Sequence, residues 1–193
     1  MTAPRLILAS ASPRRRELLT RLGVEPAGIV STDIDESARP GELPRAHAVR
    51  LAAEKARAVA VADPGAFVLA GDTVVAVGRR ILPKAEDEAT VRRCLALLSG
   101  RRHRVFSAVA LAGPDGRLRE ALSETSLRFK RFSASEIDAY IPGGEWRGKA
   151  GGYAIQGAAE AFCLWLEGSH SGVMGLPLYE TRKLLVAAGL LSG

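Results

Sequence analysis

Three consecutive arginines follow directly on a serine-rich turn near the start of the chain. The apolar run Leu6-Ile7-Leu8 indicates a buried strand, Ser12 fits the N-cap of a helix, and Pro13 fits the first helical position. Arg14–Arg16 then fall in the first helical turn, where the helix dipole disfavours cations. Backbone N–H groups, guanidinium groups and serine hydroxyls, Ser10 included, meet there and predict a phosphate-binding site. A solvated basic helix end is the alternative.

A single carboxylate interrupts the apolar run Phe67–Val77, a predicted buried strand. Gly71 precedes it and would let a ligand or another backbone segment approach closely. An unpaired buried charge is costly, so Asp72 is expected to be hydrogen-bonded, paired with a cation or bound to a metal. Because perturbed buried acids are enriched at functional sites, Asp72 is the best single catalytic candidate. A structural aspartate satisfied by a neighbouring turn is the alternative.

Two lysines occupy unusual places in the pattern. Lys55 shares the apolar face of a predicted helix over residues 45–62 with Ala48 and Leu51. Its amine either extends to water or reaches into a cleft to neutralise a phosphate. Lys84 stands between an apolar strand and the next helix, so we expect it at a sheet edge beside Asp72.

A glycine-rich loop over residues 146–157 combines a cation with a carboxamide. Lys149 supplies the cation, Gln156 supplies the carboxamide, and the glycines predict two flexible hinges. A carboxamide both donates and accepts hydrogen bonds, so Gln156 could read the edge of a uracil or thymine base. Loops of this composition are usually connectors, which is the alternative.

The other polar clusters suggest no separate site. Arg101–Arg104 is expected to be a solvated entry to a strand. The histidines are scattered at His47, His103 and His170, so there is no sign of a catalytic triad or a zinc site. The two cysteines are far apart, which argues against a disulfide.

The elements that must position these residues follow from apolar periodicity and turn signals. A capping box at Ser133–Glu136 opens a short helix, and residues 113–116 predict a hairpin turn. Strands are predicted at residues 5–9, 25–30, 67–77, 104–111, 117–130 and 158–166, and helices at residues 13–22, 45–62, 86–98, 133–140 and 177–188. This mixture predicts an α/β fold with a mixed sheet.

Bulk composition narrows the class of protein. The 193 residues suit one domain, 1–193, or two tightly packed lobes, and 47% apolar with 25% charged residues is typical of a soluble protein. A net charge of +6 predicts anionic partners. The sequence has no apolar run that could span a membrane and no leader in residues 1–10, so we expect no membrane partner and a cytoplasmic location.

Taken together, these residues closely resemble the Maf family of nucleoside triphosphate pyrophosphatases. The matching segments occur in family order along nearly the whole chain, and the ordered set is more specific than any one of them. They are Ala9–Arg15, Asp35-Glu36-Ser37, Leu51–Ala56, Gly71–Val75, Leu98-Ser99-Gly100, Lys149–Gly157 and Gly175–Leu178.

The resemblance implies a fold like that of the purine triphosphate pyrophosphatases, with an elongated mixed sheet flanked by helices and a cleft between two lobes. It implies hydrolysis between the α- and β-phosphates, giving a nucleoside monophosphate and pyrophosphate, with a divalent metal, Mg²⁺ or Mn²⁺. The loop around Tyr153 and Gln156 looks like that of the subgroup acting on dTTP and UTP, with modified pyrimidine nucleotides as a further class. Family members are often dimers, so a homodimer is expected.

This chemistry assigns each candidate a role. Substrate-binding residues are expected to be Ser10, Arg14, Arg15, Lys55, Lys84, Lys149 and Gln156. Arginine suits bidentate phosphate contacts, and lysine suits neutralisation as a point charge. Glu36, Asp72 and water are the expected metal ligands, and Asp72 either activates the attacking water or holds the metal that does so.

Two departures from the family pattern concern Lys84-Ala85, where the family usually has Lys-Pro, and Ser107, where it commonly has Thr. The first departure concerns the backbone beside Lys84, because the family proline is absent there. One alternative function is a 7-methyl-GTP pyrophosphatase, a sister subgroup whose loop lacks the Tyr and Gln. Another is a basic protein that binds nucleic acid or regulates division, but 5% aromatic residues and no nucleic-acid-binding signature argue against it.

Overall fold

A seven-stranded mixed sheet forms the centre of the computed structural model, which describes residues 4–192; residues 1–3, part of the segment in which no leader is expected, lie outside that range. The strands are β1 (Leu6–Ala9), β2 (Gly28–Val30), β3 (Phe67–Val77), β4 (Arg80–Ile81), β6 (Arg102–Ala112), β7 (Leu118–Phe129) and β9 (Cys163–Glu167). Their order is β2-β1-β3-β6-β7-β9, with β4 paired to β3. The first three are parallel and the others antiparallel, so the predicted mixed sheet is confirmed.

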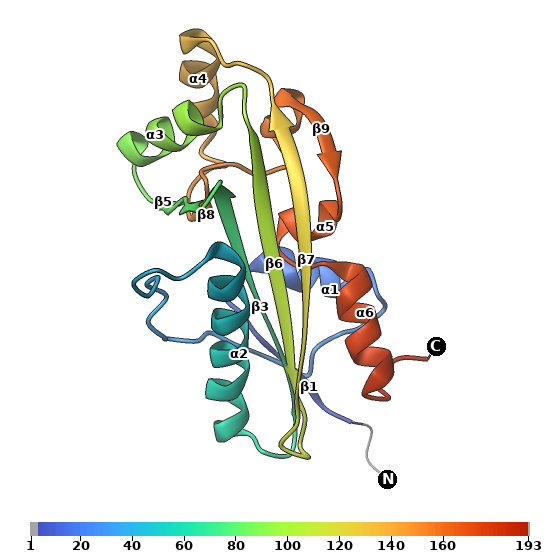
Figure 1. Cartoon of the computed structure of the whole chain (residues 1–193). Coiled ribbons are helices and arrows are strands. Elements are labelled where there is room, and N and C mark those ends of the chain that lie inside the picture. The colour runs from blue at the N-terminus through green and yellow to red at the C-terminus, as the bar shows by residue number, and fades with distance from the viewer. Residues whose placement is uncertain (1–3, 193) are drawn as a thin grey trace.

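Helices cover both faces of this sheet and one end of it. They are α1 (Pro13–Thr20), α2 (Pro44–Ala62), α3 (Glu88–Leu98), α4 (Ala134–Tyr140), α5 (His170–Met174) and α6 (Leu178–Ala187), with 3₁₀ turns η1 (Ile141–Gly143) and η2 (Ala158–Phe162). Figure 1 shows the long strands β3, β6 and β7 running through an elongated molecule, with α2 and α6 flanking the lower part and α3 and α4 at the upper end. A small second sheet pairs β5 (Lys84–Ala85) with β8 (Lys149–Ala150).

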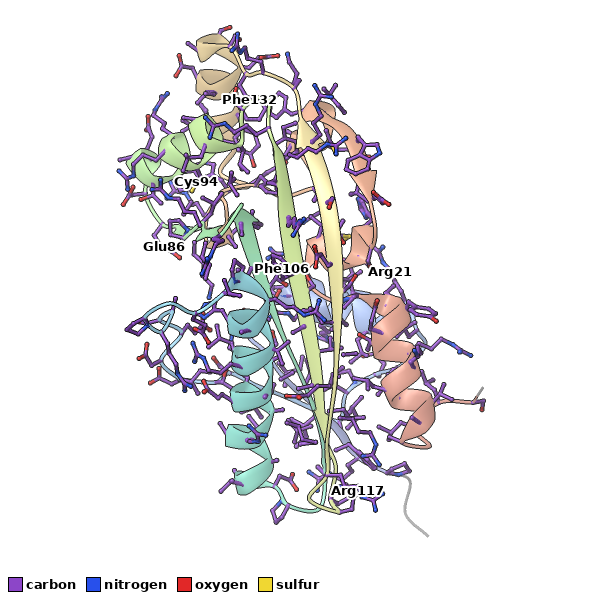
Figure 2. All side chains as sticks on the ribbon, viewed as in Figure 1. Arg21, Glu86, Cys94, Phe106, Arg117 and Phe132 are labelled. Atoms are coloured by element: carbon purple, nitrogen blue, oxygen red, sulfur yellow. The ribbon has the colours of Figure 1, made fainter. Side chains whose placement is uncertain are left out.

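The strand period of two assigns β3 side chains alternately to two apolar layers. Val68, Ala70 and Val74 pack in the layer of α2, whose small residues allow close approach to the sheet. Side chains fill the space between α2 and the sheet, and Phe106 of β6, labelled in Figure 2, belongs to this layer. The opposite layer is rich in leucine from α1, α3 and α6. Asp72 therefore belongs to the α2 side of β3.

Local signals predict most elements well, with three corrections. The capping box of α4 forms as predicted, with the Ser133 side chain on the Glu136 N–H and the Glu136 side chain on the Ser133 N–H. The strand predicted at residues 158–166 is wrong in its first half, because residues 158–162 form η2. Helix α5 is not anticipated by the sequence. Ser12 occupies the N-cap of α1, but its side chain makes no capping hydrogen bond.

Two further features bear on the class of protein. No helix within residues 4–192 is long and apolar enough to cross a membrane. Cys94 is buried, Cys163 is half-buried, and neither is in a disulfide.

Candidate active site

All nine predicted site residues line one cleft of about 360 Å³. They come from separate elements: Ser10 after β1, Arg14 and Arg15 in α1, Glu36 in the loop over residues 31–43, Lys55 in α2, Asp72 in β3, Lys84 in β5, Lys149 in β8 and Gln156 after β8. The structure thus brings together what the sequence spreads over nearly 150 positions.

Lys55 holds two carboxylates at the floor of this cleft. Its Nζ lies 2.7 Å from Asp72 Oδ1 and 2.6 Å from Glu36 Oε1. Lys55 and Asp72 are each only 5% exposed, so the amine turns into the cleft rather than out to water. The structural alternative for Asp72 is wrong in its detail, because the carboxylate is satisfied by a lysine from another element and not by a neighbouring turn.

Glu36 continues this pairing to Lys84, whose Nζ also contacts the Glu36 carboxylate. Partial burial alone would raise the pKa of Glu36, but hydrogen bonds from Lys55 and Lys84 lower it to about 2. Glu36 is therefore ionised at neutral pH. The sequence predicts Lys84 at a sheet edge beside Asp72. In the structure Lys84 lines the same cleft as Asp72, and within the described residues the link between them runs through Glu36 and Lys55.

The two arginines of α1 are held by backbone carbonyls from the other end of the chain. Arg15 Nε donates to the Gly175 carbonyl at 2.8 Å, and Arg14 Nε donates to the Met174 carbonyl at 3.3 Å. Burial lowers the pKa of both guanidinium groups, which nevertheless stay charged. Since the Nε–H groups are engaged in this way, terminal N–H groups remain to bind an anion.

Ser10 stabilises the turn that leads from β1 into α1. Its Oγ accepts hydrogen bonds from the Ser12 N–H at 3.1 Å and from Arg15 Nη1 at 3.2 Å. Ser10 is buried, so its hydroxyl orders the start of α1 and the Arg15 guanidinium together.

The glycine-rich loop is packed, so its predicted flexible hinges are wrong at the two central glycines. Gly151 and Gly152 are buried with φ of 70° and 69°, and a Cβ on Gly152 would lie 2.9 Å from Val91 Cγ2. The loop presents Lys149, half-buried, and Gln156, exposed, to the cleft. Burial lowers the pKa of Lys149, and the nearby Arg14 charge lowers it further.

His103 is a supporting residue that the sequence interpretation places wrongly. It is 2% exposed and lies between Arg102 and Arg104, which face solvent on the other side of β6. Its Nε2 is 2.9 Å from the Tyr153 hydroxyl, and burial lowers its pKa to about 4. The hydroxyl of Tyr153 is thereby engaged away from the cleft that the residue lines. The alternation of a strand, applied to residues 102–105, could have predicted that His103 faces inward.

The carbonyls of Met174 and Gly175 are contacts that sequence reasoning missed. A backbone carbonyl leaves no signal in residue type. The one available hint is Gly175, whose φ of 127° is a conformation that favours glycine.

The donor set fits a hard divalent cation. Residues 4–192 hold no cluster of three or more His, Cys, Asp and Glu side chains suited to a metal. Glu36 and Asp72 nevertheless converge on one point, the amine of Lys55. Mg²⁺ is commonly held by one or two carboxylates, with water and substrate phosphates as the other ligands. These two carboxylates suit such a site.

Comparison with known proteins decides the family. The model of the Maf-like protein family matches residues 5–188. The chain belongs to the Maf family. Similar proteins named dTTP/UTP pyrophosphatase include one from Novosphingobium aromaticivorans, 76% identical over 187 residues that cover 97% of this chain and 93% of the relative. Another, from Caulobacter vibrioides, is 59% identical over 186 residues and covers 96% of each chain.

A solved structure shares the fold of this Maf protein. The HAM1 protein from Coxiella burnetii matches 95% of this chain and 99% of its own, with a TM-score of 0.53 and 16% identity. At that identity the similarity supports the fold alone, which is the elongated sheet with helices on both faces seen in Figure 1.

Proposed function

We propose that this Maf protein hydrolyses dTTP and UTP between the α- and β-phosphates, releasing the nucleoside monophosphate and pyrophosphate. The observation that carries the proposal is one cleft in which five cations surround two carboxylates. The cations are Arg14, Arg15, Lys55, Lys84 and Lys149, and the carboxylates are Glu36 and Asp72. The names of the similar proteins supply the substrates and the reaction.

The surplus of cations suits a triphosphate. Phosphoryl transfer needs mainly positioning and charge stabilisation, so a covalent nucleophile is not required. The terminal N–H groups of Arg14 and Arg15 can bind phosphate oxygens in pairs, while the lysines act as point charges. Buried cations act more strongly here than in water because the local dielectric is lower.

Asp72 is the proposed group that receives or directs the proton of the attacking water. Its Oδ1 accepts from Lys55, and no residue of the described chain hydrogen-bonds to Oδ2, which is left to orient a water molecule. An incoming phosphate would compete for the Lys55 amine and so release Asp72 from part of its charge pairing. Geometry thus links substrate binding to the availability of the base.

The alternative role that we propose for Asp72 is to hold Mg²⁺ or Mn²⁺ together with Glu36, in which case Oδ2 would be a metal ligand instead of the group that orients the water. The ion, when bound, supplies neutralisation of the phosphate oxygens. The lowered pKa of Glu36 keeps that oxygen donor ionised across the neutral range. Removal of the metal with a chelator is expected to abolish turnover and leave the fold intact.

Base selection is proposed to depend on Gln156. Its side chain is exposed at the cleft, where both a donor and an acceptor are available to a pyrimidine edge. Preference for 7-methyl-GTP is the second candidate, but the resemblance of the loop around Gln156 favours the pyrimidine subgroup. Modified pyrimidine nucleotides, a homodimer and a cytoplasmic location stay predictions.

A substrate panel tests this function. Purified protein is given dTTP, UTP, CTP, dCTP, GTP, ATP or 7-methyl-GTP with Mg²⁺ or Mn²⁺, and pyrophosphate is measured against a metal-free control. Release confined largely to dTTP and UTP is the expected result. Preference for 7-methyl-GTP would refute the role of Gln156, and no release by folded protein from any nucleotide would refute the enzyme.

A further inference from the structure

Glu36 lies in a loop that forms neither helix nor strand, yet its carboxylate must meet two lysines from different elements. The loop spans residues 31–43, between β2 and α2. A local turn next to Glu36 is closed by the hydrogen bond from the Ser37 N–H to Asp35 Oδ1 at 2.9 Å. Such a turn orders neighbouring residues but does not attach the loop to the rest of the protein. A contact from outside the loop is needed.

Arg50 of α2 makes the contact that lies nearest to Glu36 along the loop. Two other contacts join the loop to α2 nearer its end, Arg39 with Glu54 at 3.0 Å and His47 with Glu42 at 2.9 Å. The Nη2 of Arg50 donates to the Ser37 carbonyl at 3.0 Å, one residue after Glu36. The same guanidinium donates two hydrogen bonds to the carboxylate of Glu42, near the end of the loop, from Nε at 2.6 Å and from Nη2 at 2.8 Å. Its Nη1 donates to Glu54 on α2 at 3.0 Å. One side chain therefore joins two points of the loop to the helix that also carries Lys55.

The Arg50–Glu42 contact is shielded from solvent, unlike an ordinary surface ion pair. The side chains of Arg50 and Glu42 are 14% and 9% exposed. Glu42 also accepts the backbone N–H of Arg39 at 3.0 Å, which closes the turn before α2. The hydrogen bond from Arg50 holds the pKa of Glu42 well below its usual range, so the pair stays charged at any pH at which the protein would be assayed.

The geometry requires an arginine. Five N–H donors in a planar fork reach two carboxylates and a carbonyl at once, whereas a lysine offers one compact charge. Arg50 also lies slightly more than one helical turn before Lys55. The same helix, α2, therefore positions both the backbone beside Glu36 and the Lys55 amine that the Glu36 side chain contacts.

We propose that Arg50 is a positioning residue for the candidate active site, which holds the loop over residues 31–43 on α2 so that Glu36 faces Lys55, Lys84 and the metal. Arg50 does not line the cleft and touches no reacting group. The inference deepens the proposed function and, in its metal readout, rests on it.

Arg50→Lys is the test variant, and Arg57→Lys is its matched control. Arg57 is exposed on the same helix and makes no ion pair or hydrogen bond within residues 4–192. Hydrogen exchange of residues 33–42 is measured in the metal-free, nucleotide-free protein. We expect exchange at least about tenfold faster in Arg50→Lys and unchanged in Arg57→Lys, since the loop then opens without unfolding the core.

Mn²⁺ titration of the nucleotide-free protein gives the second readout, followed by paramagnetic resonance. The half-saturating Mn²⁺ concentration is expected to rise at least about tenfold in Arg50→Lys, the lower end of the range typical of the loss of support behind a metal ligand. A merely structural role would lower the melting temperature and leave this concentration unchanged. Should Arg50→Lys fail to fold, Glu42→Gln weakens the same contact from the other side.

The outcomes are distinguishable. Unchanged loop exchange, unchanged Mn²⁺ affinity, or a wild-type protein that binds no Mn²⁺ would each overturn the role of Arg50. A wild-type protein that binds Mn²⁺ but releases no pyrophosphate would overturn the proposed function alone, because the exchange and titration need no nucleotide.

Discussion

At the scale of single residues, the central feature is a buried ion pair with a third partner. Removing two charges from water is costly, and breaking such a pair leaves one charge uncompensated. Lys55 and Asp72 are held in this way, with Glu36 as the second acceptor of the amine. A purely structural core would gain stability from apolar residues at these positions, so their presence in a cleft favours chemistry as the reason for them.

Asp72→Asn should remove turnover while the protein stays folded. The amide keeps the shape of the carboxylate and Glu36 still pairs with Lys55, so the melting temperature should change little. Loss of the base or metal ligand should lower kcat at least about 100-fold. Steady-state kinetics and circular dichroism check this, with the exposed Asp33→Asn as control. Undiminished hydrolysis by Asp72→Asn would remove Asp72 from the mechanism.

Gln156→Glu should disturb base choice more than phosphate handling. A carboxylate cannot donate to a base carbonyl, so kcat/KM for UTP and dTTP should fall at least about tenfold, in line with the loss of a hydrogen bond that leaves a polar partner unpaired. Inhibition by pyrophosphate, which has no base, should be unchanged. Equal slowing of every nucleotide in the panel would show that Gln156 does not read the base.

At the scale of elements, the site depends on segments that are packed against each other rather than on mobile loops. The glycine-rich loop presses on β3 and α3, where Gly151 lies against Val75 and Gly152 against Val91. Helix α5 ends at carbonyls that hold both arginines of α1. Because these elements lie far apart in the chain, the arginines and the loop can keep their places only while the whole sheet is formed.

Gly152→Ala should destabilise the protein and displace the loop that carries Lys149 and Gln156. The substitution combines a φ of 69° with a Cβ placed 2.9 Å from Val91 Cγ2, and should cost about 2–4 kcal/mol. Gly148→Ala is the matched control, since its φ is 65° but its nearest neighbour, Glu86 Oε1, lies 4.0 Å away. Urea unfolding of both variants checks this. An equal loss of unfolding free energy in the two variants would show that the contact with Val91 does not contribute to the destabilisation.

Local sequence signals predict the elements better than the contacts between them. The capping box of α4 and the hairpin at residues 113–116 involve residues close in sequence, and both form as predicted. The apolar run over residues 158–166 has no such marker, so its pattern predicts a strand throughout, although residues 158–162 form η2. Helix α5 has only five residues, too few to show the helical periodicity of apolar residues from which a helix is predicted.

The candidate site was predicted as a set of residues, but its pairing was not. Lys55 and Asp72 can be singled out from the sequence, because charged residues are unusual within apolar patterns. Their contact with each other, however, depends on how α2 lies across β3. The contact of Arg50 with Ser37 depends on the path of an irregular loop, which no periodicity describes. The carbonyl contact of Gly175 is made by the backbone, so no side chain predicts it and the glycine is the one hint to it.

At the scale of the whole molecule, one buried histidine should link stability to pH. Burial lowers the pKa of His103 from 6.5 to about 4. The unfolded chain therefore takes up a proton as the pH falls through 6.5, while the folded protein does so only near 4. The stability contributed by the neutral imidazole is complete above pH 6.5 and is lost as the pH falls toward 4, by up to about 3 kcal/mol.

His103→Gln should flatten this pH dependence between pH 6.5 and 4, while retaining an acceptor for the Tyr153 hydroxyl. His170→Gln, at an exposed position, should leave it unchanged. Urea unfolding at several pH values checks both. The stability that depends on ionised Glu36 is lost at lower pH, between pH 4.5 and about 2. It therefore does not obscure the comparison of the two histidine variants. A wild-type slope in His103→Gln would show that another group is responsible.

The products formed from dTTP test the central claim most directly. The cleft of cations around Asp72 is proposed to direct water to the bond between the α- and β-phosphates. Chromatography of the reaction with Mg²⁺ should then show dTMP and pyrophosphate in equal amounts, and neither product with Asp72→Asn. Formation of dTDP and phosphate, or no turnover by folded wild-type protein, would contradict the account.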